Sequence, residues 1–352
     1  MKTLCDISAL RYHRMPPVIH EVIDERLDQA LGPGNWSFEG VAELLGLPKQ
    51  PVHLLCTNQA ARRHTVHQKT QLISAALPFG SRWDFGSYSS VTSPALTLFT
   101  LASHLSVVQL AMLMHEFCGN FSVYRPTKQE RAYLQELCSQ EASGDHGGWK
   151  PVLDANGKIT DLWQRPAISN INELEKLAND LARAKGRATF IQALRLTREG
   201  AASPFEARTG IRLSTPRRLG GEGLSDLTFN ARIELTDQAQ LVAGQAKAYI
   251  DIVLRNPASG DEVGIECQSK LIHDREEKAI ADANRITALQ SMGHTIVQLS
   301  YRNLEDQAAF ESVLSFIFKK LKINRIPKSP SLLRKERQLC YELFENGGAI
   351  DW

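Results

Sequence analysis

Two acidic residues stand at matching places in consecutive apolar segments of the chain. Asp251 lies in KAYIDIVL (247–254), and Glu266 lies in EVGIECQ (262–268). Side chains alternate along a β-strand, so both carboxylates can share one face if the two segments are neighbouring strands. Two buried carboxylates repel each other, and a hard divalent cation bound by oxygen ligands is a reason to keep both ionised. The pattern therefore predicts a Mg²⁺ or Mn²⁺ site suited to phosphodiester hydrolysis.

The segments around these acids predict the elements that must hold them. Residues 203–213, SPFEARTGIRL, are typical of a helix start, with Ser203 as cap, Pro204 in the first turn and Glu206 completing an S-x-x-E pattern. Three strands, an amphipathic helix, a buried strand and a second long helix follow. Their ranges are 227–235, 247–254, 262–268, 276–292, 294–300 and 308–321. We therefore expect an α/β protein whose C-terminal part is an α/β/α sandwich with a mixed sheet.

In this order of elements, Glu206, Asp251 and the run Glu266-Cys267-Gln268 resemble the PD-(D/E)XK restriction-endonuclease-like nucleases. The likeness covers residues 203–321 and is greatest to the DUF559 and very-short-patch-repair branch. It includes the SPFE helix start, the PRRLGG turn, the DANRITAL helix and the SMGHTIVQLS strand. The resemblance implies a restriction-endonuclease-like fold and a metal-dependent DNA endonuclease or nickase. It also implies that Asp251 and Glu266 hold the Mg²⁺ or Mn²⁺ ion, with Glu206 as an additional metal ligand or as a carboxylate that orients the metal.

Gln268 stands where the motif often has lysine. The resemblance then implies that Gln268 positions the attacking water. Lys270, two residues further along the same strand face, could supply the missing positive charge. His273, after the strand, would be a proton shuttle or a phosphate contact. A site without its lysine also admits a second interpretation, in which the fold binds DNA without cutting it.

Each candidate also has an ordinary structural interpretation. Glu206 is explained as the third residue of a capping box that reaches back to the amide of the capping serine. Asp251 and Glu266 could be surface residues, because a D…E-x-[KQ] match occurs by chance in many chains. His273 could be a solvated loop histidine, and Lys270 a charge at the edge of a strand. The strand context and the resemblance favour the site for the acid pair.

Positive charge is concentrated locally, since the net charge of the chain is only +2. Arg217 and Arg218 precede a Gly-Gly pair, and residues 319–337 carry eight basic residues against one acid, Glu336. We expect both places to contact a phosphate backbone, although a basic helix end can equally be a solvated face that complements the helix dipole. The candidate DNA contacts are Arg217, Arg218, Lys319, Lys320, Lys322 and Arg325.

The length of 352 residues favours more than one domain. We expect a mixed α/β domain in residues 1–140 that binds DNA or a partner. A turn-rich hinge and a connecting helix follow in residues 141–200. The nuclease-like domain would occupy residues 201–325, and residues 326–352 would form a basic C-terminal helix or tail.

The first half of the chain suggests an alternative function. Between residues 50 and 200, the run LPFGS…SPALTLFTLASHL…LAMLMHEFCGNFSV resembles the region that precedes DUF559 domains in proteins related to AbiEi antitoxins of type IV toxin–antitoxin systems. This resemblance implies a non-catalytic transcriptional regulator or antitoxin whose degenerate nuclease fold binds DNA.

Three histidines in the first half, His53, His64 and His67, could suggest a zinc site together with Cys56. Their spacing matches no known pattern of zinc ligands. His53 and Cys56 would lie on opposite faces of an apparent strand, because they are three residues apart. We therefore expect ordinary polar contacts for these residues.

Six widely spaced cysteines without a CxxC pair exclude a dense disulfide framework and favour a reducing cytoplasm. The N-terminal residues lack the apolar core of a secretory signal, and the apolar run at 91–114 is interrupted by proline and polar residues, so we expect no membrane partner. DNA is the expected partner. One site of this type cuts one strand, so double-strand cleavage would need a homodimer or two successive nicks.

Overall fold

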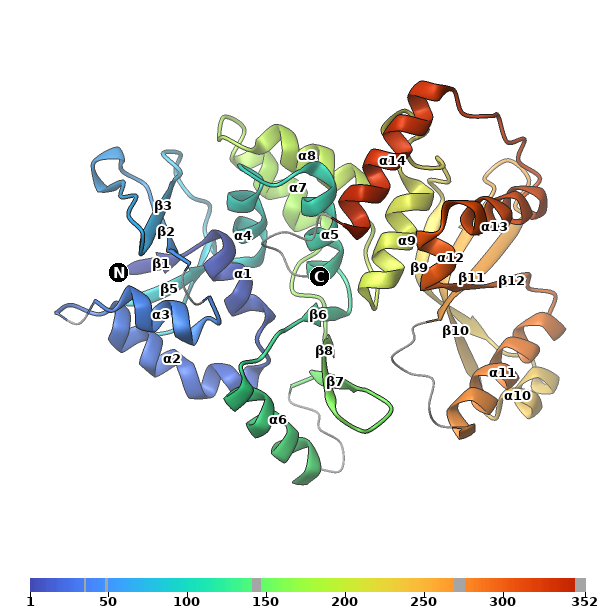
Figure 1. Ribbon diagram of the computed structural model, residues 1–352, viewed down its shortest axis with the longest axis horizontal. Coiled ribbons are helices and arrows are strands. Elements are labelled where there is room, and N and C mark those ends of the chain that lie inside the picture. Colours follow the sequence, from blue (N-terminus) through green and yellow to red (C-terminus); the bar gives the residue numbers. More distant parts are fainter. Residues whose placement is uncertain (35, 48–49, 141–146, 269–275, 346–352) are drawn as a thin grey trace. The chain divides into compact units, whose positions relative to one another are not determined.

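The computed structural model describes residues 1–34, 36–47, 50–140, 147–268 and 276–345 (Figure 1). The chain divides into two compact units. The first contains Met1–Val152 and Ile159–Thr197, and the second contains Leu153–Lys158 and Arg198–Gly347. Both units combine helices with β-sheets, which confirms the predicted α/β class.

A five-stranded mixed sheet forms the centre of the first unit. Across the sheet the strands are β3 (Gln68–Leu72), β2 (Val52–Cys56), β1 (Lys2–Leu4), β5 (Ser89–Thr92) and β4 (Arg82–Asp84). Strand β1 runs parallel to β5 and antiparallel to β2. Helices α1 (Asp6–Arg14), α2 (Pro17–Leu31) and α3 (Phe38–Leu44) contribute to one apolar core with these strands. Burial of this core stabilises the unit.

Helices α4 (Pro94–Leu101) and α5 (Val107–Phe117) form a pair in and just after the apolar run at 91–114. The Ser93 hydroxyl accepts a hydrogen bond from Leu96 N at the start of α4, and Cys118 ends α5. Helices α7 (Ile171–Asp180) and α8 (Arg187–Leu196) pack against this pair. The segment that we expected to connect the domains therefore adds two helices to the first unit.

We predicted a turn-rich hinge at the start of residues 141–200, but residues 150–164 contain two strands. Strands β7 (Lys150–Leu153) and β8 (Ile159–Gln164) form a three-stranded sheet with β6 (Phe121–Val123). Helix α6 (Lys128–Gln140) lies between β6 and β7 in the sequence. The turn signals mark a hairpin, because Asp154 accepts hydrogen bonds from the backbone N of Asn156 and Lys158. Trp163 is fully buried, which gives the hairpin an apolar anchor.

A four-stranded mixed sheet forms the centre of the second unit. Its order is β12 (Ile296–Ser300), β11 (Glu262–Gln268), β10 (Lys247–Arg255) and β9 (Leu227–Glu234). Strands β9, β10 and β11 are successively antiparallel, and β12 runs parallel to β11 after the crossover helix α11 (Glu276–Ser291). The predicted order of three strands, a helix and a strand is confirmed, as are the neighbouring positions of β10 and β11.

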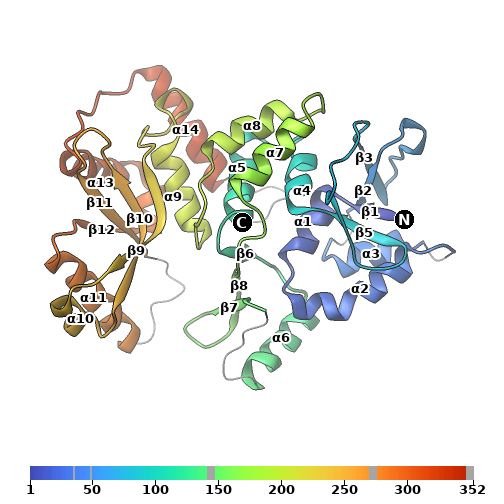
Figure 2. The same cartoon turned by 180° about the vertical axis from the view of Figure 1, so that it is seen from behind.

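Helix α9 (Pro204–Ser214) lies against β9 and β10 (Figure 2). A Cβ atom at Gly210 would lie 2.3 Å from Cζ of Phe229, so this position must lack a side chain for the helix to approach β9. Helices α12 (Tyr301–Glu305), α13 (Gln307–Lys320) and α14 (Pro330–Phe344) complete the unit. The sequence did not lead us to predict α10 (Asp237–Ala243), although Thr236 and Gly244 are typical of its two ends.

Candidate active site

Asp251 and Glu266 lie on neighbouring strands in matching register. Ile252 of β10 pairs with Ile265 of β11 in an antiparallel arrangement, so the next positions along the two strands are Asp251 and Glu266. The Asp251 Oδ2 atom accepts a hydrogen bond from Cys267 N at 2.7 Å. This hydrogen bond fixes the Asp251 carboxylate at the end of the β10–β11 pairing.

The two acids are buried together. Glu266 is only 5% exposed, and burial together with the charge of Asp251 raises its pKa to about 7. Burial also raises the pKa of Asp251, while the hydrogen bond from Cys267 N opposes this rise. Charge repulsion and desolvation thus favour protonation of this pair, and both effects would be relieved by a bound cation.

Glu206 reaches the same site from the first turn of α9. It is 6% exposed, and burial together with the charge of Asp251 raises its pKa to about 8. Its Oε1 atom accepts from the Ser203 hydroxyl at 2.9 Å, and its Oε2 atom accepts from Ala202 N at 2.8 Å. The capping contact therefore reaches Ala202 and not the Ser203 amide that we expected. Glu206 thus both caps the start of α9 and belongs to the acidic site.

Asn230 connects Glu206 to the sheet, a role that the sequence did not reveal. Its backbone has a φ of +49°, in the left-handed region that asparagine tolerates better than most residues. The Asn230 Nδ2 atom donates to Glu206 Oε2 at 2.9 Å and to Gly200 O at 2.7 Å. In the pairing of β9 with β10, Ala231 lies opposite Ile250 and Phe229 lies opposite Ile252. Asn230 is therefore opposite Asp251. An asparagine inside the apolar strand LTFNARIEL was the available signal.

Arg285 of α11 is the second residue that sequence reasoning missed. Its Nη2 and Nη1 atoms donate to Glu266 Oε2 and Oε1 at 3.0 and 3.3 Å, which makes the ion pair bidentate. The Nη1 atom also donates to Tyr249 O at 2.6 Å. The DANRITAL helix was predicted, but periodicity could not show that its arginine turns toward the acids.

The remaining predicted catalytic residues lie at or beyond the end of β11. Gln268 is half-buried, and its position pairs with Ser300 of β12. Lys270 and His273 lie outside the described residues. The structure therefore brings Glu206, Asp251 and Glu266 together, and the roles of Gln268, Lys270 and His273 stay predictions.

The donor chemistry of this site fits Mg²⁺ or Mn²⁺, because all three acids offer oxygen ligands, and burial together with the charge of Asp251 raises the pKa of both Glu206 and Glu266. Within the described parts of the chain, no group of three histidine, cysteine or acidic side chains is arranged to hold a metal ion. Mg²⁺ often keeps several waters and needs only one or two carboxylates. Asp251 and Glu266 are therefore the residues that would hold it.

Several predicted DNA contacts have partners within the protein. Arg217 Nη2 donates to Ile326 O at 2.5 Å, and the Lys335 ammonium donates to Arg218 O. Arg325 lies 2.5 Å from Glu311 and 3.5 Å from Glu222, and Lys322 lies 2.8 Å from Asp261. Lys319 and Lys320 are exposed at the end of α13.

A buried ion network explains part of the basic segment. Lys328 is 6% exposed and lies 2.5 Å from Glu222 and 2.8 Å from Glu336, the one acid of residues 319–337. This network joins the start of α14 to the rest of the second unit. Some of the positive charge that we assigned to DNA contact therefore serves the fold.

The three histidines and Cys56 of the first unit are not gathered into one site. His53 faces Asp6, His64 accepts from Arg62 Nε at 3.1 Å, and His67 lies 3.6 Å from Glu39. Cys56 is buried at the end of β2. Each histidine thus has a different polar partner.

Asp6 of α1 is the centre of a separate polar cluster. It is fully buried with a φ of +56°, and its carboxylate accepts from His104 Nε2 and Gln71 Nε2, both at 2.7 Å. His53 Nδ1 lies 3.3 Å away, and the Asp6 amide donates to the Thr100 hydroxyl. Burial would raise the pKa of Asp6, but hydrogen bonds from His104 and His53 lower it well below its ordinary value. This cluster ties α1 to β2, β3 and the end of α4.

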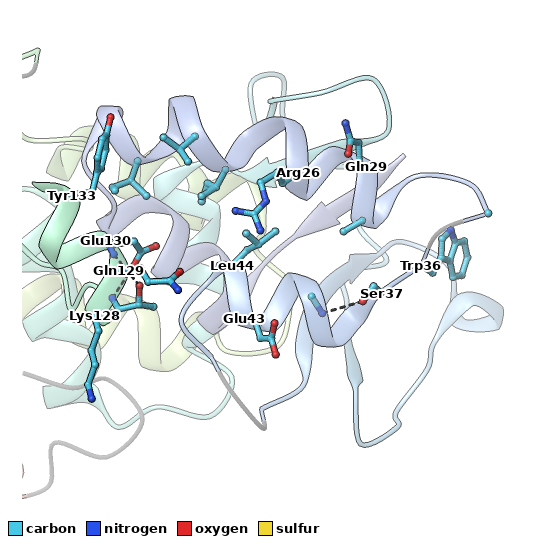
Figure 3. Close-up of a pocket in the computed structure, with 17 residues that line it drawn as sticks. Arg26, Gln29, Trp36, Ser37, Glu43, Leu44, Lys128, Gln129, Glu130 and Tyr133 are labelled. Atoms are coloured by element: carbon cyan, nitrogen blue, oxygen red, sulfur yellow. Dashed lines mark hydrogen bonds between the residues drawn. The ribbon is translucent and has the colours of Figure 1, made fainter.

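A cavity of about 1240 Å³ lies between α2, α3 and α6 of the first unit (Figure 3). Apolar side chains such as Ile23 and Leu44 line it together with charged ones such as Arg26, Glu43 and Lys128. Its lining mixes both signs of charge, whereas the site on α9, β10 and β11 is centred on three acids.

Comparison of the chain with models of protein families, with characterised proteins and with solved structures finds no match. Among the helices that the structure describes, none is long and apolar enough to cross a membrane. All six cysteines are free thiols.

Proposed function

We propose that the chain is a metal-dependent nuclease that hydrolyses phosphodiester bonds in DNA with a restriction-endonuclease-like second unit. The observation that supports this proposal is the convergence of Glu206, Asp251 and Glu266 from a helix and two strands, where burial raises the pKa of all three. Collecting like charges inside an apolar unit opposes folding unless a ligand needs them. A divalent cation held by Asp251 and Glu266 is the ligand that these oxygen donors suit best.

In this proposal Asp251 and Glu266 bind Mg²⁺ or Mn²⁺. Glu206, fixed by Asn230 and by its own helix start, orients the site from α9. The bound ion would supply a Lewis acid for the phosphate and lower the pKa of a coordinated water. Gln268, which starts from the same strand as Glu266, orients the attacking water through its amide.

DNA contact is assigned to the exposed end of α13, with Lys319 and Lys320, and to the turn at Arg217 and Arg218. Arg325 has a weaker claim, because it pairs with two acids of the same unit. Bacterial DNA defence or repair in the cytoplasm is the setting that the family resemblance and the free thiols favour.

A second candidate function is DNA binding without cleavage, as in an AbiEi-like regulator or antitoxin. The observation that favours it is the bidentate ion pair of Arg285 with Glu266, which already neutralises one proposed metal ligand. Gln268, which stands where the motif often has lysine, also favours DNA binding without cleavage. This candidate predicts DNA binding that survives both EDTA and Asp251→Ala.

The two candidates are separated by a plasmid cleavage assay with Mg²⁺, Mn²⁺ or EDTA. The wild type is compared with Asp251→Ala and Glu266→Ala, and with Glu234→Gln as a matched acid on an exposed part of the same sheet. A nuclease requires metal-dependent cleavage that both alanine variants lose and Glu234→Gln keeps. Cleavage that persists in both alanine variants would indicate a contaminant. DNA binding without cleavage in any metal would favour the regulator.

A further inference from the structure

Arg285 of α11 contacts both strands that carry the acid pair. Its guanidinium spans from α11 to the carbonyl of Tyr249 in β10 and to the carboxylate of Glu266 in β11. It lies 3.5 Å from Asp282 on its own helix. The positive charge is thus placed beside the two strands that carry Asp251 and Glu266.

This ion pair differs from a purely structural one in the same protein. Arg14 and Glu116 of the first unit form a bidentate pair whose side chains are 1% and 0% exposed. The side chain of Arg285 is 21% exposed while that of its partner Glu266 is 6% exposed, so this pair, unlike Arg14 and Glu116, is partly accessible from solvent. The guanidinium of an accessible arginine has the planar fork that binds a phosphate.

The chemistry of the site needs such a charge. A pentacoordinate phosphate gains negative charge, and Gln268 can orient water but cannot offset that charge. Gln268 lies two residues beyond Glu266 on the same strand, so a cation paired with Glu266 is close to the position that a lysine at 268 would serve.

We propose that Arg285 contacts the scissile phosphate and supplies the positive charge that a lysine at position 268 would otherwise supply. This inference rests on the proposed nuclease function. Before substrate binds, Arg285 is held on Glu266. When DNA binds, the fork turns toward the phosphate while α11 keeps its position.

The test uses the full-length protein with Arg285→Gln, Arg285→Lys and the double variant Gln268→Lys/Arg285→Gln. Arg255→Gln is the matched control, because Arg255 pairs with Glu262 across the same two strands at their other end. Plasmid cleavage with Mg²⁺ gives the rate. Binding of a short DNA duplex in EDTA, at several salt concentrations, gives the affinity and its salt dependence.

We expect Arg285→Gln to lower cleavage by about a hundredfold or more, the scale of losing one group that stabilises transition-state charge. The slope of log affinity against log salt should fall by about one, as for one lost phosphate contact. Arg285→Lys should keep the slope and part of the rate. Gln268→Lys should restore at least about tenfold of the rate lost in Arg285→Gln, and Arg255→Gln should match the wild type.

An unchanged affinity and salt slope in folded Arg285→Gln would overturn the inference and leave Arg285 as a partner of Glu266 only. So would a double variant no faster than Arg285→Gln. If Arg285→Gln fails to fold, the double variant Glu266→Gln/Arg285→Gln replaces it, because this variant leaves no unpaired buried charge. Its salt slope is then compared with that of Glu266→Gln. A wild type that cuts nothing refutes the nuclease function, and the salt slope then decides whether Arg285 contacts phosphate.

Discussion

Replacing Glu206 with glutamine is expected to stabilise the metal-free protein above about pH 8 and to leave its stability unchanged near pH 5. Burial and the charge of Asp251 raise the pKa of Glu206 from 4.5 to about 8. The folded state therefore binds a proton that the unfolded chain has already lost in this pH range. Stability falls as pH rises from about 4.5 toward 8 and levels off beyond it.

The magnitude follows from the size of this pKa difference. One unit of pKa corresponds to about 1.4 kcal/mol, so a rise from 4.5 to about 8 sets an upper bound of about 5 kcal/mol. Glu266 responds to the same Asp251 charge, so the two effects are not additive. We expect the free energy of unfolding to fall by about 2–3 kcal/mol through Glu206.

Glutamine suits this position because it imitates the protonated acid. The protonated Oε1 can donate to the Ser203 hydroxyl, and an amide NH₂ can do the same. The amide oxygen can accept from Ala202 N and Asn230 Nδ2, as Oε2 does now. Glu206→Gln thus keeps the contacts and removes the charge.

Urea unfolding from pH 5 to pH 9 in EDTA measures this effect, with Glu234→Gln as the control for an exposed acid. The wild type and the control should lose stability together, while Glu206→Gln loses less. Equal pH dependence in wild type and Glu206→Gln would show that Glu206 is not buried beside Asp251 and would remove the acidic cluster on which the proposed function depends.

Three further predictions concern other positions. Gln268→Ala should lower metal-dependent plasmid cleavage about tenfold or more because a positioning contact is lost, whereas Gln268→Lys should keep or raise it; equal rates for Gln268→Ala and wild type would exclude Gln268 from the site. Asp6→Asn should lower the free energy of unfolding at pH 7 by about 2–4 kcal/mol in urea unfolding, because His104 and His53 lose a buried charged acceptor. The depressed pKa of Asp6 makes this loss shrink as pH falls, and a loss independent of pH would argue against it. Gly210→Ala should lower the midpoint of thermal unfolding, since the new Cβ would lie 2.3 Å from Phe229; an unchanged midpoint would mean that α9 can shift on the sheet.

The sequence predicted the elements of the second unit because their signals are local. Alternating apolar residues mark β10 and β11. Asp251 lies four residues before the end of β10 and Glu266 lies four residues after the start of β11, so the two acids are neighbours when the strands pair as a hairpin. A capping pattern marks the start of α9. These features depend on residues close together in the chain.

Two contacts of the site depend on tertiary structure and could not be predicted in the same way. Asn230 takes part because its backbone adopts a positive φ within a strand, which interrupts the alternation that identified the strand. Arg285 takes part because the rotation of α11 about its axis turns it toward β10 and β11, and helical periodicity leaves that rotation open. The hairpin of β7 and β8 was missed because its strands are short and the turn residues Asp154, Asn156 and Gly157 between them dominated the interpretation of this segment.

The balance of charge in the site at neutral pH bears on both candidate functions. With the pKa of Glu206 at about 8 and that of Glu266 at about 7, much of the acidic charge is neutralised by protons, and Arg285 offsets more of it. A DNA phosphate can therefore approach the metal-free site without strong repulsion, which either candidate function requires. Only a nuclease needs the acids to give up those protons, because carboxylates bind a metal in their ionised form. The raised pKa values of Glu206 and Glu266 therefore oppose metal binding near neutral pH, and a nuclease should bind its metal more tightly as pH rises toward 8.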